Sequence, residues 1–215
     1  MHLQISKKIV IYLFVYFMLV TINNINFLKF DLLKIKNLEI YGLNKSENEK
    51  LKQEIKYLQN KSIFFLNKSK ILNSINSNEI IEEFIVFKKY PSSLNIEIKK
   101  ADYLAITKKN QLDYYIGSNG KLIKYDNSFK DLPYVFGDVD TQNFLMIKKI
   151  IDSTNLNFYE IKNLYFYKSQ RWDIEMKNGL VIKLPLESVK SSLDILDKLK
   201  KKEEFKKIKV IDFRQ

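Results

Sequence analysis

The chain has 215 residues, enough for one or two domains, and 46% hydrophobic with 29% charged residues excludes an intrinsically disordered chain. The net charge of +12 comes from 37 scattered basic residues without an aromatic-interleaved basic motif, so we expect no nucleic-acid partner. The absence of cysteine excludes disulfide bonds, thiol catalysis and zinc–thiolate sites.

The amino-terminal segment is apolar. Lys7 and Lys8 precede an unbroken apolar run over residues 9–20, which residues up to 28 can extend toward the ~20 residues that a membrane span needs. A cleaved signal peptide is one alternative, but small residues at a cleavage site are missing. A buried core helix is another. We predict a signal anchor at residues 9–28, a cytoplasmic tail at residues 1–8 and the bulk of the chain outside.

Residues 33–101 predict a small domain that begins with a strand and two helices. The strand alternates imperfectly up to Gly42. Ser46 and Glu49 fit a capping box before the first helix, and residues 63–66 are expected to form a short apolar plug. Apolar residues at helical spacing mark the two helices: Leu51, Ile55 and Leu58, then Ile71, Leu72 and Ile75.

A hairpin completes this domain at residues 80–99. Pro91 cannot donate a hydrogen bond to a neighbouring strand, so it ends the first strand at Tyr90. Ser92 and Ser93 form the corner, and strict alternation from Leu94 predicts a half-buried second strand. The result is a β-α-α-β-β unit in which two helices cover one face of a three-stranded sheet.

Residues 102–215 predict a mostly antiparallel β domain with two helices, which makes the fold class α+β. The tetrapeptide Gly-Ser-Asn-Gly at 117–120 is interpreted as a tight turn, because it lacks the lysine and hydroxyl residue that end a phosphate loop. Asn178-Gly179 predicts a type I′ hairpin. The expected strands are 103–108, 111–116, 122–123, 132–137, 161–167, 171–176, 180–184 and 208–215; helices follow from Phe144, Ile147 and Ile151, and from Val189, Leu193, Leu196 and Leu199.

The sequence shows no residue pattern that indicates a catalytic site. The only histidine is His2, in the amino-terminal tail, so a Ser-His-Asp arrangement is excluded. Candidate carboxylates sit at strand ends and turns, where solvated aspartate is ordinary: Asp113, Asp126, Asp131 and Asp138. No calcium-loop spacing occurs. We therefore expect no catalytic residues, metal, cofactor or small-molecule substrate, and we interpret the sole tryptophan, Trp172, as part of the core.

Several segments together resemble the FtsQ/DivIB family of bacterial cell-division proteins. In order they are IYGL, NKSIFFL, FKKYPSSLNIEI, NGKLI, LPYVFG, RWDIEMKNGLVIKLP and VIDFR, and the later ones look most like the alphaproteobacterial branch. The resemblance covers nearly the whole chain. This sequence departs from the family pattern at Lys100, Tyr103 and Gly117, and it ends at Gln215, where many relatives continue.

The resemblance implies a POTRA domain at 33–101 and an FtsQ-type β domain at 102–215. It also implies a single-pass type II protein of the inner membrane, with its bulk in the periplasm, at the division septum. In that role the protein is a non-catalytic scaffold whose partners are FtsB- and FtsL-like division proteins, held by strand addition at the last strand. The alternatives are a POTRA-containing outer-membrane assembly or secretion factor, and a periplasmic wall enzyme.

Two surfaces are candidates for partner binding. A closing strand from Lys207 to Gln215 at a sheet edge would offer unpaired backbone groups. Because both faces of this strand carry apolar residues, we expect a bulge or cover on both sides. The candidate residues are Lys209, Val210, Ile211, Asp212, Phe213, Arg214 and Gln215 in the closing strand, Arg171 beside it, and Lys89, Tyr90 and Pro91 as a second surface on the POTRA domain.

The two arginines are conspicuous in a chain that otherwise uses lysine. Arg171 and Arg214 both fall in the carboxy-terminal sheet. A guanidinium makes a forked contact to carboxylate that lysine cannot make, so we expect at least one to meet an acidic side chain of the partner. Chance placement, or an internal pair with Asp173 or Asp212, is the alternative.

Overall fold

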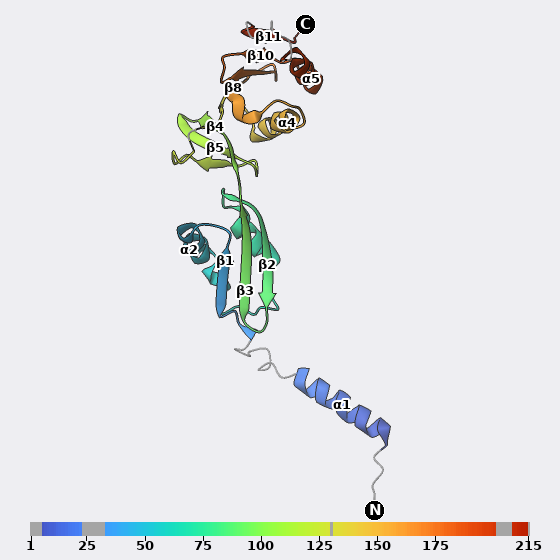
Figure 1. Ribbon diagram of the computed structural model, residues 1–215. Coiled ribbons are helices and arrows are strands. Elements are labelled where there is room, and N and C mark those ends of the chain that lie inside the picture. Colours follow the sequence, from blue (N-terminus) through green and yellow to red (C-terminus); the bar gives the residue numbers. More distant parts are fainter. Residues whose placement is uncertain (1–5, 23–32, 130, 201–207, 215) are drawn as a thin grey trace, which may run out of the picture. The chain divides into compact units, whose positions relative to one another are not determined.

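The computed structural model of the chain describes residues 6–22, 33–129, 131–200 and 208–214 (Figure 1). The described chain forms two compact units. The first unit is Met1–Ile75 with Phe84–Ile98, and the second is Asn76–Glu83 with Lys99–Gln215.

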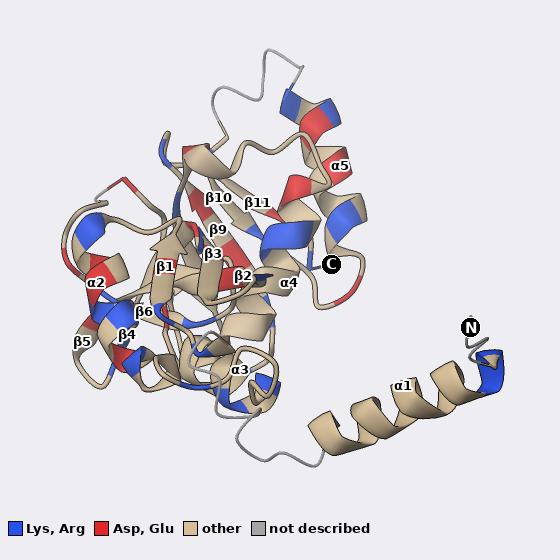
Figure 2. Cartoon of the chain, turned by 90° about the horizontal axis from the view of Figure 1, so that it is seen from below, with Lys and Arg blue, Asp and Glu red and all other residues tan. Residues whose placement is uncertain are grey.

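The amino-terminal helix α1 runs over Lys7–Ile22. The side chains of residues 7–21 are exposed, and the helix is uncharged apart from the lysines at its start (Figure 2). Sixteen residues extend for about 24 Å, less than the ~30 Å hydrocarbon core of a bilayer. Within the described ranges, none of the helices is both long and apolar enough to span a membrane. Residues 23–28 of the expected anchor lie outside the described residues.

The β-α-α-β-β arrangement expected for residues 33–101 is confirmed. Its elements are β1 (Asn37–Tyr41), α2 (Lys45–Glu54), the short 3-10 helix η3 (Lys56–Leu58), α3 (Lys68–Asn76), β2 (Ile81–Lys89) and β3 (Ser93–Lys100). The strand order is β1-β3-β2, with β1 parallel to β3. Alternation buries Leu38 and Ile40 of β1, and Leu51, Ile71 and Ile75 of the helices are buried as well.

Two local predictions in this region are wrong. The capping box lies at Asn44 and Glu47: the Asn44 side chain accepts from the Glu47 backbone N–H at 2.8 Å, and the Glu47 carboxylate accepts from the Asn44 N–H at 3.2 Å. Ser46 already lies in the first turn of α2, because asparagine caps a helix as well as serine does. The expected apolar plug buries only Ile63 fully, while Phe64 and Phe65 are exposed.

The second unit is built on one eight-stranded sheet of order β11-β10-β9-β8-β7-β4-β5-β6. The strands are β4 (Tyr103–Lys109), β5 (Leu112–Gly117), β6 (Leu122–Lys124), β7 (Tyr134–Phe136), β8 (Ile161–Phe166), β9 (Trp172–Met176), β10 (Val181–Lys183) and β11 (Val210–Asp212). Helices α4 (Thr141–Asp152) and α5 (Val189–Lys200) and the 3-10 helix η4 (Phe158–Glu160) complete the unit.

The sheet is mixed, so the expectation of a mostly antiparallel sheet needs correction. The pairs β4–β7, β7–β8 and β10–β11 are parallel. Helix α4 separates β7 from β8, and α5 separates β10 from β11. A crossover through a helix returns the chain in the same direction, which a tight hairpin cannot do. The helices predicted from the sequence therefore already carried the information that two of these pairs are parallel.

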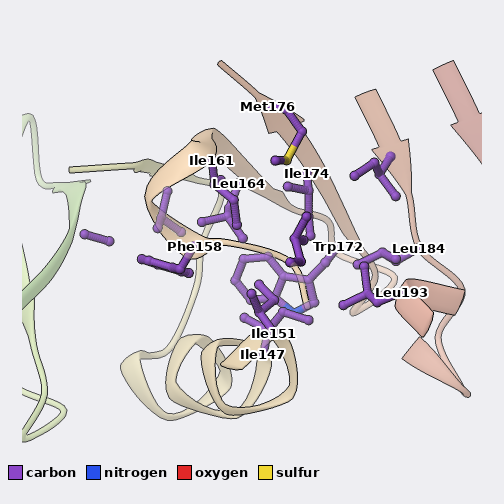
Figure 3. Packing of buried hydrophobic residues seen from close by; sticks show 14 of the residues in the cluster. Ile147, Ile151, Phe158, Ile161, Leu164, Trp172, Ile174, Met176, Leu184 and Leu193 are labelled. Atoms are coloured by element: carbon purple, nitrogen blue, oxygen red, sulfur yellow. The ribbon is translucent and has the colours of Figure 1, made fainter. Parts of the chain in front are cut away.

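The larger core cluster of the second unit lies between the sheet and its two α-helices. Phe144, Ile147 and Ile151 of α4 and Leu193 and Leu196 of α5 are buried with the inward residues of the strands. Trp172 is 7% exposed and packs in this cluster, as predicted (Figure 3). Its ring lies 4.8 Å from the ring of Phe166. A smaller core cluster is formed by Ala101, Ile106, Tyr115 and Ile123.

The second unit contains both of the tight turns expected from the sequence. Asn178-Gly179 does join β9 to β10, but only the glycine has positive φ, at +87°, so the turn is not type I′. In the turn at 117–120, the Asn119 amide donates to the carbonyls of Glu79 and Ile81 at 2.8 and 2.9 Å. The Lys121 ammonium donates to the carbonyl of Asn78 at 3.0 Å. These bonds explain why residues 76–83 belong to the second unit.

Candidate partner-binding site

The last described strand lies at one edge of the eight-stranded sheet. β11 pairs in parallel with β10, in the register Val181↔Val210, Ile182↔Ile211 and Lys183↔Asp212. Its strand geometry covers only Val210–Asp212, so the expected strand from 207 to 215 is too long. Lys207 and Gln215 lie outside the described residues.

The hydrogen bonds of β11 identify which backbone groups face outward. The Val181 N–H donates to the Lys209 carbonyl at 2.8 Å, and the Phe213 N–H donates to the Lys183 carbonyl at 3.0 Å. Residues 209, 211 and 213 therefore point their backbone groups toward β10. The N–H and C=O groups of Val210 and Asp212 then point away from the sheet, as the alternation of a strand requires. An edge of this kind can template pairing with another strand.

The side chains of this segment also divide by alternation. Ile211 and Phe213 are half-buried and pack on the helix-covered core. Ile208 and Val210 are exposed, with 52% of Val210 accessible. A bulge or cover on both sides was expected to accommodate apolar residues on both faces. β11 instead keeps a regular register and leaves one apolar face in contact with solvent.

Arg214 forms an internal ion pair with Asp212. Its Nε donates to Asp212 Oδ1 at 2.8 Å, and its Nη2 donates to the other carboxylate oxygen. This forked contact lowers the pKa of Asp212 and raises that of Arg214. The Arg214 backbone N–H also donates to Asp212 Oδ1 at 3.0 Å. For Arg214, the geometry thus matches the internal-pair alternative.

Arg171 is placed differently. Its Nε donates to the Ser169 hydroxyl at 3.0 Å in the loop that joins β8 to β9. Within the described residues it forms no salt bridge to a carboxylate. Both arginines lie close enough to Tyr167 to lower its pKa, although burial and Asp173 raise it more strongly. The fold therefore brings Arg171 and Arg214 near one tyrosine, although they are 43 positions apart in the sequence.

A row of polar side chains crosses the sheet toward this edge. The registers align Tyr165 with Asp173, Asp173 with Lys183, and Lys183 with Asp212. Asp173 is 5% exposed, and its Oδ1 has no hydrogen-bond partner within the described residues. Sequence reasoning missed Tyr167 and Lys183. The alternation in Trp-Asp-Ile-Glu-Met of β9, which turns Asp173 away from the core, was the available signal.

The second candidate surface lies in the first unit. Lys89 ends β2, and Tyr90 and Pro91 follow it at the tip of the β2–β3 hairpin. All three are exposed, and the Tyr90 ring lies 5.1 Å from that of Phe64. They belong to the first unit, whereas β11 belongs to the second.

Known proteins resemble the chain over both units. The family model "Cell division protein FtsQ/DivIB, C-terminal" matches residues 105–214, just over half of the chain, and the model "POTRA domain, FtsQ-type" matches residues 33–100. The chain belongs to the FtsQ/DivIB family. The family is one of cell-division proteins and is not catalytic.

Individual relatives are distant. Cell division protein FtsQ from Rickettsia bellii is 24% identical over 169 residues, which cover 78% of this chain and 63% of that protein. FtsQ from Bradyrhizobium diazoefficiens is 26% identical over 160 residues, covering 71% and 46%. Both are alphaproteobacterial. The chain thus spans less than two thirds of the length of these relatives.

A solved structure also matches part of the chain. It is the major extracytoplasmic domain of DivIB from Geobacillus stearothermophilus, with 14% identity and a TM-score of 0.34. The match covers 43% of this chain and 85% of that domain. A likeness this low adds nothing to the family match.

Proposed function

We propose that this protein is a membrane-attached scaffold of the division machinery that holds FtsB- and FtsL-like partners by strand addition at β11. The observation that carries the proposal is the position of β11 at the edge of the sheet, where no other described strand pairs with it. The N–H and C=O groups of Val210 and Asp212 point away from β10 there. A partner strand that pairs there would satisfy these groups and extend the sheet by one strand.

The exposed side chains of the edge suit such a partner. Ile208 and Val210 present an apolar face beside the free backbone groups, and an apolar residue of the incoming strand can cover it. Strand addition draws its affinity from main-chain hydrogen bonds and its specificity from alternate side chains. The partner strand should therefore carry an apolar residue opposite Val210.

Arg171 is the arginine that we assign to a carboxylate of the partner. Arg214 already uses its fork on Asp212, whereas the described carboxylates leave the Arg171 guanidinium without an ion pair. A forked contact between Arg171 and an acidic side chain beside the incoming strand would fix the register of the pairing.

We further propose that α1 is part of a signal anchor at residues 9–28, which places a type II protein in the inner membrane with its bulk in the periplasm at the septum. The support is the exposed apolar surface of α1 after Lys8, which water solvates poorly. A membrane anchor would raise the local concentration of partners that are tethered to the same membrane.

Co-purification tests this function. The full chain is co-expressed with the FtsB- and FtsL-like proteins of the same organism and is compared with a version that ends at residue 206. We expect the partners to co-elute with the full chain and to be lost from the shortened one, whose folding is checked by circular dichroism. Failure of the folded full chain to retain either partner would contradict the proposal.

A further inference from the structure

The end of the three-stranded sheet where β1 begins carries exposed aromatic residues. Phe65 is 76% exposed, Tyr90 58% and Phe64 52%. The rings of Phe64 and Tyr90 lie 5.1 Å apart, so they form one cluster rather than scattered side chains. Exposed aromatic residues gathered at one end of a domain mark an interaction surface.

Backbone hydrogen bonds bring three segments together at this end. The Ile63 N–H donates to the Leu33 carbonyl at 2.9 Å, and the Ile35 N–H donates to the Lys61 carbonyl at 3.0 Å. The Lys36 N–H donates to the Ser92 carbonyl at 2.8 Å. Residues 33–37, 60–68 and 86–93 therefore form one surface, which we name the sheet base.

The sheet base is uniformly basic. Its three segments contain six lysines and no Asp or Glu: Lys34, Lys36, Lys61, Lys68, Lys88 and Lys89. All of these except Lys34 are exposed, and Lys34 is half-buried. Two kinds of side chain favour the headgroup layer of a membrane. Amphipathic aromatic rings are enriched at the membrane–water interface, and lysine ammonium groups are attracted to anionic lipids.

The position of the base in the chain favours the same partner. Ten residues, 23–32, connect the apolar helix α1 to Leu33, and ten residues reach at most about 36 Å. Phe64 and Phe65 directly follow Ile63, which is bonded to Leu33, so the aromatic cluster lies where the chain enters the sheet. We propose that the sheet base docks on the anionic lipid surface of the membrane, so that the first unit rests on the bilayer.

This inference rests on the proposed membrane attachment through α1, and one experiment separates the two. Since the chain has no cysteine, Ser92→Cys provides a single labelling site on the base, and Ser191→Cys provides a control site on α5. Each full-length variant carries an environment-sensitive fluorophore and is reconstituted in vesicles whose headgroups bear a quencher. The vesicles contain phosphatidylcholine with or without phosphatidylglycerol, and flotation reports attachment independently.

We expect the label at residue 92 to be quenched more strongly than that at residue 191, and only with phosphatidylglycerol present. Lys88→Gln and Lys89→Gln should each lower the ratio of docked to undocked protein about fivefold, since each lysine near an anionic surface contributes about 1 kcal/mol. Lys108→Gln, in the second unit, should leave the ratio unchanged. Phe65→Ser should lower it, whereas Tyr159→Ser, at a site 73% exposed, should not.

Three outcomes would overturn the docking. Equal quenching at residues 92 and 191 in floating vesicles would show that the base stays away from lipid. Quenching at residue 92 that does not depend on phosphatidylglycerol or on the Lys→Gln changes would contradict an electrostatic attraction between the base and the lipid. Unlabelled Ser92→Cys protein could instead form disulfide-linked dimers that disappear when Phe65→Ser is added to the same chain. That result would make the sheet base an interface between two copies of the chain. Failure of the chain to float at all would instead contradict the attachment through α1.

Discussion

The two faces of the eight-stranded sheet differ in what they contact. One face packs on α4 and α5 and is lined by apolar residues such as Trp172, Ile174 and Ile182. The other carries tyrosines and charges over β8–β10, among them Tyr165, Asp173 and Lys183. Over β4–β6 it carries a smaller buried cluster that includes Ile106 and Ile123. β11 contributes to both, because Ile211 turns to the core and Val210 to solvent.

This difference indicates how stability and recognition are divided. Burial of apolar area stabilises the fold through the covered face. The solvent-exposed side chains at the β11 edge contribute little to burial, so their contacts can change without unfolding the domain. Changes on the covered face should alter stability, and changes at the edge should alter partner affinity at nearly constant stability.

The largest effect is expected from the covered face. Trp172→Ala would leave a cavity among Phe166, Ile147 and their neighbours, and should lower the free energy of unfolding by about 3–5 kcal/mol. Urea denaturation measures the change. Val210→Ala, at a side chain that is 52% exposed on the other face, is the control and should cost far less. Similar losses in both variants would erase the distinction between the faces.

The next effect should appear at the edge. Val210→Pro removes an N–H that points away from β10, so the pairing of β11 with β10 survives while the partner loses a hydrogen bond. Affinity for the FtsB-like partner, measured by calorimetric titration, should fall about tenfold or more. Val210→Thr keeps both the N–H and the branched shape, and should bind nearly normally. Equal binding by all three proteins would argue against strand addition.

Substitution of the two arginines should affect partner affinity to different degrees. Arg171→Lys replaces a fork by a point charge and should weaken partner binding about tenfold if the guanidinium meets a carboxylate. Arg214→Lys disturbs an exposed internal pair that contributes little to stability, and it should change affinity by less than about fivefold. A larger loss for Arg214→Lys would reverse the assignment.

The smallest effect concerns pH on the polar face. Hydrogen bonds from Asn163, Tyr165 and Lys162 lower the pKa of Glu175 from 4.5 to about 2. A depressed carboxyl pKa contributes stability that is present above pH ~4.5 and is lost as the pH falls toward 2. Glu175→Gln should therefore flatten the loss of stability between these values, as urea midpoints at several pH values would show. An unchanged slope would contradict this origin.

Much of the fold followed from periodicity. The helices around Phe144 and Val189 and the hairpin at Tyr90-Pro91 carry strong local signals, namely apolar spacing and a residue that cannot donate. The length of β11 did not follow, because apolar residues at 208, 210, 211 and 213 suit a long strand, whereas only three pair with β10. Alternation within a strand does not report its direction; for two of the parallel pairs, the predicted helices between the strands were the available signal.

The candidate site was only partly accessible to sequence reasoning. The position of the closing strand at a sheet edge was predicted from its place at the end of the chain. Arg171 was predicted as a candidate because a guanidinium can form a forked contact to a carboxylate. The pairing of Arg214 with Asp212 stayed open, since residues two apart on a strand meet only when the rotamers allow it. Tyr167 could not be identified from the sequence, because its neighbours Arg171, Asp173 and Arg214 come from segments that meet only in the folded chain.

Amide hydrogen exchange of the full chain, resolved by residue and with saturating FtsB-like partner, tests strand addition most directly. The outward groups of β11 alternate with the groups that face β10, and the partner should reproduce that alternation. We predict new protection at Val210 and Asp212, and little change at Ile211. Saturated binding with unchanged exchange at Val210 and Asp212 would contradict strand addition at this edge.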